Sequence, residues 1–67
     1  MLTVDARGLS CPEPVMLMLD AIGKTTEPVV VLVDNATARG NVSHMAEERG
    51  RKVTITEEGG DFRLLLE

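Results

Sequence analysis

Aromatic residues are almost absent from this sequence of 67 residues, which contains one phenylalanine, Phe62, and no tryptophan or tyrosine. Proteins that bind single-stranded nucleic acids commonly stack the bases on aromatic side chains. The net charge of −4 also repels a polyanion, and the sequence has no run of basic residues. We therefore expect no direct binding of nucleic acid, and a core filled by aliphatic side chains and methionines.

Cysteine and histidine occur once each, as Cys11 and His44. One cysteine cannot form an internal disulfide, and one cysteine with one histidine cannot supply the three or four ligands of a protein metal site. His44 is expected on the solvent-exposed side of a helix, where it would not serve as a catalytic base. The sequence thus predicts neither a metal nor a cofactor.

Long apolar runs are missing as well. No segment approaches the roughly 20 apolar residues of a membrane-spanning helix, and the start of the sequence lacks the pattern of a signal peptide. Together with the single cysteine, these absences lead us to expect a cytoplasmic protein that does not associate with a membrane.

The apolar residues that are present predict six elements in the order βαβαββ. Alternating or β-branched apolar runs indicate strands, and apolar residues at helical spacing indicate helices. The expected strands cover roughly 2–6, 29–33, 53–56 and 62–66, and the expected helices cover roughly 12–22 and 36–49. Gly23 is expected to end the first helix. Asn35 and Asn41 are interpreted as helix caps rather than ligand contacts, and Asn41 is an alternative start of the second helix because Gly40 disfavours a helix interior.

Right-handed crossovers place both expected helices on one face of a single sheet. The fourth strand lies antiparallel to the third, and its apolar composition favours an interior place, which gives the strand order 1-2-4-3. We therefore predict one domain over residues 1–67 of the α/β fold class. Its architecture is a two-layer α+β sandwich with a four-stranded mixed sheet and one open sheet face.

The segment Ser10-Cys11-Pro12-Glu13-Pro14 is the most unusual part of the chain. Pro12 fits the first helical position and Pro14 the first turn, where backbone N–H groups have no partner within the helix, so Cys11 is expected at the N-cap. The partial positive charge of the helix start favours the thiolate form of a cysteine there. No second cysteine follows at the C-x-x-C spacing, which excludes a dithiol cycle within the chain. We predict a reactive thiol suited to reversible exchange.

The residues from Asp5 to Val15, D-A-R-G-L-S-C-P-E-P-V, resemble the TusA/SirA-like sulfur-carrier family, whose hallmark is a C-P-x-P segment after a first strand. The expected βαβαββ order is also the fold of that family, so the resemblance covers the whole chain. It implies that Cys11 is the catalytic residue and carries sulfur as a persulfide. The sulfur would come from a donor protein of the cysteine desulfurase or rhodanese type and pass to a downstream acceptor protein. The other residues expected to support the site are Pro12, Glu13, Pro14, Arg7 and Gly8.

Within the family, the segment 33–42 resembles the YedF branch, which is described as related to selenium metabolism. The resemblance therefore leaves open whether the carried atom is sulfur or selenium. Chains of that branch often continue into a DsrE-like domain. This sequence is accordingly either a free-standing protein or one domain of a longer chain, and a DsrE-like domain is a candidate partner.

Other features allow more than one interpretation. Arg7 could pair with Asp5 or stabilise the anionic persulfide, and the sequence favours neither. Met16 and Leu17 are expected on the less buried side of the first helix, where a partner protein could contact them. An alternative function is a non-catalytic partner-binding or regulatory module. That alternative rests on the open sheet face and on the candidate exposed leucines Leu17, Leu32 and Leu65.

Overall fold

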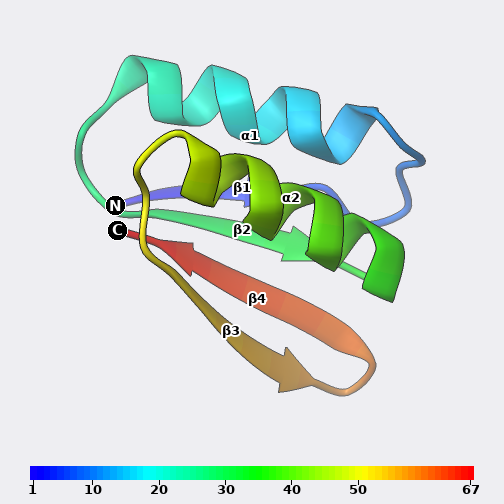
Figure 1. Cartoon of the computed structure of the whole chain (residues 1–67). Helices are drawn as coiled ribbons and strands as arrows, with labels where there is room; N and C mark the ends of the chain where they lie inside the picture. Colours follow the sequence, from blue (N-terminus) through cyan, green and yellow to red (C-terminus); the bar gives the residue numbers. More distant parts are fainter.

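The computed structural model describes residues 1–67 and contains the six expected elements in the expected order (Figure 1). Their bounds are β1 Leu2–Asp5, α1 Glu13–Lys24, β2 Val29–Val33, α2 Ala36–Glu48, β3 Val53–Glu58 and β4 Asp61–Leu66. The strands form one mixed sheet in the order β1-β2-β4-β3, and both helices cover the same side of it (Figure 1). The predicted two-layer fold and the predicted strand order are confirmed.

The pairing of the strands determines where the helices begin. β1 and β2 are parallel, with Val4 opposite Val31, whereas β4 lies antiparallel to both β2 and β3. The carboxyl ends of β1 and β2 therefore meet at one edge of the sheet, and each is followed by a loop and a helix. As a result, α1 and α2 both begin above this edge (Figure 1).

The core lies between the helices and the sheet and is almost entirely aliphatic. Met18 of α1, Val42 of α2, Val31 of β2 and Leu64 of β4 are all fully buried. The rest of the buried cluster consists of Ala6, Ala21, Val29, Val33, Ala38, Ala46 and Leu66. Phe62 is only partly buried against it. The expected aliphatic core with methionine filler is observed.

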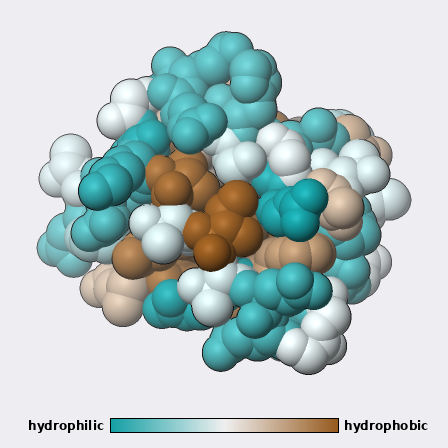
Figure 2. Space-filling model, turned by 60° about the horizontal axis from the view of Figure 1, so that its bottom comes forward, coloured by the Kyte–Doolittle hydropathy of each residue, from teal (hydrophilic) through white to brown (hydrophobic).

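The opposite face of the sheet is uncovered and carries a small apolar cluster. Val29, Val31 and Val33 point into the core, so strand alternation directs Val30 and Leu32 to the other face. Leu65 is paired with Val30 across the sheet and shares that face. Turning the lower side of Figure 1 forward shows a group of apolar side chains within a polar surround (Figure 2).

The ends of the helices differ from expectation in two places. Gly23 does not end α1, because it is not among the glycines with positive φ, and the helix continues to Lys24 before Thr25 turns extended. Asn41 is not the start of α2. The side-chain oxygen of Asn35 accepts a hydrogen bond from the Ala38 amide at 2.7 Å and caps the helix six residues earlier.

Gly50, with φ 84°, follows α2 and supplies the left-handed conformation that commonly ends a helix. Neither helix has both the length and the apolar character needed to cross a bilayer.

Candidate functional site

Cys11 lies in the loop between β1 and α1, at the sheet edge where both helices begin (Figure 1). Its side chain is exposed, and it is the only cysteine of the chain. The expectation that Cys11 is the N-cap of α1 is wrong by one residue. Pro12 occupies that position, and no side chain caps the helix. The reason is a turn in which the Glu13 amide donates to the Ser10 carbonyl at 3.0 Å, so that Cys11 and Pro12 precede the first helical residue.

The start of α1 nevertheless leaves a free backbone donor near the thiol. Pro14, in the second helical position, has no N–H, and the Glu13 amide is used in the turn. The Val15 amide stands four residues after Cys11 but donates to neither the Cys11 nor the Pro12 carbonyl. Unpaired amides of this kind give a helix start its affinity for negative charge.

A small pocket separates the start of α1 from α2, and Cys11 forms part of its wall. Its volume is about 30 Å³. It is lined by Leu9, Cys11, Pro14, Val15, Asn35, Thr37, Ala38 and Asn41. A space of this size holds about one or two water-sized atoms.

Asn41 is the side chain of α2 that reaches the sulfur. Its amide Nδ2 donates to Cys11 Sγ at 3.7 Å, a distance typical of hydrogen bonds to the large sulfur atom. Asn41 is half-buried, whereas Cys11 is exposed at the mouth of the pocket. The interpretation of Asn41 as a helix cap is therefore replaced by a contact with the cysteine.

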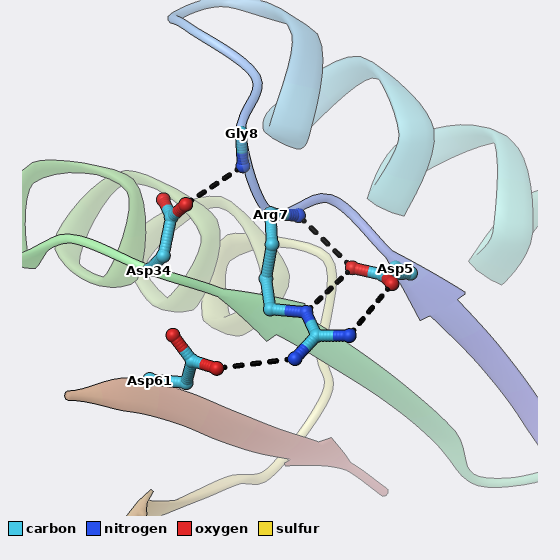
Figure 3. A network of polar contacts seen from close by, with 5 residues as sticks. All are labelled: Asp5, Arg7, Gly8, Asp34 and Asp61. Carbon is cyan, nitrogen blue, oxygen red and sulfur yellow. Dashed lines mark hydrogen bonds and ion pairs between the residues drawn. The ribbon is translucent and has the colours of Figure 1, made fainter. Parts of the chain in front are cut away.

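The loop that carries Cys11 is anchored by a network of polar contacts (Figure 3). Nε and Nη2 of Arg7 donate to the two carboxylate oxygens of Asp5, both at 2.9 Å, and Nη1 donates to Asp61 at 3.1 Å. The Gly8 amide donates to the Asp34 carboxylate at 2.7 Å. Gly8 has φ 77°, a conformation that other residues adopt only with strain, so a glycine suits this position.

The geometry favours the pairing of Arg7 with Asp5 over the stabilisation of an anionic persulfide. All three side-chain nitrogens of Arg7 are engaged by carboxylates, so the observed arrangement is the pairing with Asp5, extended to Asp61. The hydrogen bonds from Arg7 lower the pKa of Asp5 from 3.8 to about 2. The same contacts, in which the carboxylates of Asp5 and Asp61 accept hydrogen bonds from the guanidinium, raise the pKa of Arg7. Arg7 therefore holds the loop and stays charged.

The remaining residues named from the sequence do not line the pocket. Glu13, Met16 and Leu17 are exposed on α1, with 61% of Met16 and 39% of Leu17 accessible to solvent. His44 is also exposed, and its Nε2 lies 2.8 Å from a carboxylate oxygen of Glu48, as expected for a surface histidine.

Asn35, Thr37 and Asn41 were not predicted as site residues. Thr37 and Asn41 are four residues apart, a spacing that places two side chains near one another on a helix. Only the crossover that sets α2 beside α1 brings that helix face to the cysteine.

Comparison with known proteins agrees with this arrangement. The model of the family described as Sulfurtransferase TusA matches residues 2–67. The chain belongs to this family. It is also similar to a SirA-like protein from Desulfitobacterium hafniense, whose crystal structure superposes with a TM-score of 0.90 at 34% sequence identity, covering 98% of this chain and 95% of that one. A search of the curated proteins found no significant match.

Membership of the TusA family gives the chain a sulfur-carrier role in general terms. The predicted TusA/SirA-like identity is confirmed. The finer assignment to the YedF branch stays a prediction.

Proposed function

We propose that this TusA-family chain relays sulfur as a persulfide on Cys11. The observation that carries the proposal is the placement of the exposed Cys11 thiol at the mouth of a pocket, within hydrogen-bond reach of Asn41. An exposed thiol beside a pocket is accessible to a partner protein. A sulfur carrier needs this access for both loading and transfer.

The transfer is an exchange in which no oxidant or reductant is consumed. The Cys11 thiolate attacks the outer sulfur of a donor persulfide, a new sulfur–sulfur bond forms on Cys11, and the donor leaves as a thiolate when its own sulfur–sulfur bond breaks. In the second step an acceptor thiolate attacks the outer sulfur on Cys11, and Cys11 leaves as the thiolate. The sulfur moves in its zero-valent state, so the chain returns to its starting form.

The donor is a protein of the cysteine desulfurase or rhodanese type, and the acceptor is a second protein, for which a DsrE-like domain is a candidate. Exposed Met16 and Leu17 follow Cys11 on α1 and offer apolar contact area to both partners. Glu13 at the start of the same helix adds negative charge, which favours partners with a basic docking surface, whereas Asp20 is paired with Lys24. The compartment proposed for the relay is the cytoplasm, where thiols stay reduced.

Intact-mass measurement tests the proposal. The protein is incubated with a cysteine desulfurase and cysteine, or with a rhodanese and thiosulfate, and then weighed without reducing agent. The wild type should gain the mass of one sulfur atom, and Cys11→Ser should gain none. Equal adducts on both proteins, or no adduct on the wild type with either donor, would reject the persulfide relay. A selenium donor in a parallel reaction distinguishes the two elements, because the mass of the adduct identifies the atom on Cys11.

The open sheet face supports a second candidate, a non-catalytic binding module. Strand alternation and register place Val30, Leu32 and Leu65 on that face, and Figure 2 shows a group of apolar side chains there. A cellular function that survives Cys11→Ser but not Leu32→Asp would favour the binding module over the relay.

A further inference from the structure

The pocket between α1 and α2 contains about 30 Å³ of empty space beside the Cys11 side chain. We propose that it receives the outer sulfur of the Cys11 persulfide, and that the side-chain amide of Asn41 holds this sulfur by a hydrogen bond. The inference rests on the proposed persulfide relay and assigns to it a sulfur-binding residue from the second helix.

The dimensions of the pocket suit one added sulfur atom. A sulfur–sulfur bond is about 2 Å long, so the outer atom of a persulfide stays close to Cys11 Sγ. The pocket is lined by Cys11 and has a volume of about 30 Å³, which accommodates one further atom of this size. Leu9, Pro14 and Ala38 provide apolar wall, which limits contact between the bound atom and water.

Among the side-chain amides that line the pocket, Asn41 is the one that is free to serve as a donor. The other candidate, Asn35, has both ends of its side chain engaged, because its oxygen accepts from Ala38 and its nitrogen donates to Asp34 at 3.2 Å. The only hydrogen bond of the Asn41 side chain is the one to Cys11 Sγ at 3.7 Å. An amide nitrogen has two N–H groups, so a second donor remains for an outer sulfur next to Sγ.

The hydrogen bond has a consequence for how long the loaded state lasts. A persulfide in its anionic form concentrates negative charge on the outer sulfur, and hydrogen bonds to charged groups are stronger than those between neutral groups. Asn41 thus stabilises the loaded form against loss of sulfur to small thiols. A partner protein removes the sulfur by docking at the pocket mouth, where Cys11 is exposed.

The experiment compares wild type, Asn41→Ala and Asn41→Asp after loading with a persulfide donor. Asparagine and aspartate have the same shape, but the carboxylate can only accept hydrogen bonds and repels an anionic sulfur. Each loaded protein is mixed with a small thiol, two molecules of which convert the persulfide to the Cys11 thiol, hydrogen sulfide and a disulfide. Intact mass then gives the rate at which the loaded form disappears.

Asn41→Ala should lose its sulfur about fivefold to tenfold faster than wild type, and Asn41→Asp faster still. The control is Ser43→Asp, which adds the same charge to α2 outside the pocket lining and should behave as wild type. Urea unfolding of each variant checks that the fold is intact.

The outcomes separate the two proposals. If wild type acquires no sulfur, the relay fails and this inference fails with it. If wild type loads on Cys11 but both Asn41 variants lose the sulfur at the wild-type rate, the sulfur-binding role of Asn41 is overturned while the relay stands. Equal acceleration by Ser43→Asp would assign the effect to net charge and would also overturn it.

Discussion

Arg7 links the end of β1 to the start of β4, which lie far apart in the sequence. It stands two residues after the end of β1, forms a two-point ion pair with Asp5, and reaches across the sheet to Asp61 (Figure 3). The planar guanidinium of arginine makes such paired contacts with a geometry that lysine cannot reproduce. The cysteine loop is thereby tied to the sheet on one side, while Gly8 and Asp34 tie it to the start of α2.

Acid should weaken the stabilisation of the folded state by the ion pair between Asp5 and Arg7. Its pKa in the folded protein, about 2, lies below its ordinary value of 3.8. The stabilisation is therefore complete above about pH 4 and is lost as the pH falls through about 2. Urea unfolding over this range should show a steeper decline in stability for wild type than for Asp5→Asn, which lacks the titrating group. High salt should reduce the difference because the pair is exposed. Identical pH profiles for the two proteins would contradict the role assigned to this ion pair.

The sequence predicted that Cys11 is the reactive residue, but it did not predict that Asn41 contacts it. The two prolines around Glu13 indicated a helix start, and the chemistry of a lone cysteine there followed from local rules. The contact between Cys11 and Asn41 joins residues 30 positions apart. It depends on how α2 packs beside α1, which no local pattern encodes.

Gly40 and Gly50 differ in their effect on α2, although glycine generally disfavours a helix. The helix continues through Gly40 and ends before Gly50. Gly40 lies inside the helix, without positive φ, and a Cβ atom added there would meet nothing within 4 Å. Gly50 has φ 84° and lies just beyond the end of the helix. The helix passes through Gly40 because the Asn35 cap and the burial of Val42 and Ala46 outweigh the propensity of one residue.

Alanine substitutions should separate these roles. Gly40→Ala should raise the free energy of unfolding by about 0.5–1 kcal/mol, because alanine costs less conformational entropy in a helix than glycine. Gly50→Ala, its matched control, should lower it by about 1–2 kcal/mol, because an alanine at positive φ is strained. Urea denaturation monitored by circular dichroism gives both values. A loss of stability in Gly40→Ala would mean that the helix is distorted at this point.

Element types and order followed from periodicity, whereas the ends of the helices did not. The β-branched run of β2 and the apolar spacing of α1 are strong patterns, and the crossover rule then left few topologies. The end of α1 was misplaced at Gly23 because a glycine stops a helix only when it adopts positive φ. That conformation depends on where the following chain must go, here towards Pro28 and β2.

The molecule as a whole has one packed sheet face and one open face. Every fully buried large side chain belongs to the side covered by the helices. Val30, with 3% of its surface exposed, is the buried residue that points to the open face. A domain below about 70–80 residues rarely gains more than 3–5 kcal/mol from such a core. Stability is therefore concentrated in a few side chains, and the open face stays available for contacts.

Substitution of two adjacent leucines of β4 tests the difference between the packed face and the open face of the sheet. Leu64 is fully buried under the helices, whereas Leu65 points to the open face and is half-buried. Leu64→Ala should cost about 2–5 kcal/mol, enough to leave much of the protein unfolded without denaturant, and Leu65→Ala about 1 kcal/mol. Circular dichroism with urea titration measures both free energies.

Equal losses of stability in the two variants would mean that the open face is buried in solution. If a second copy covered it, the cost of Leu65→Ala would change with protein concentration, since association stabilises the folded state by mass action. A cost independent of concentration would leave that face free for a different protein.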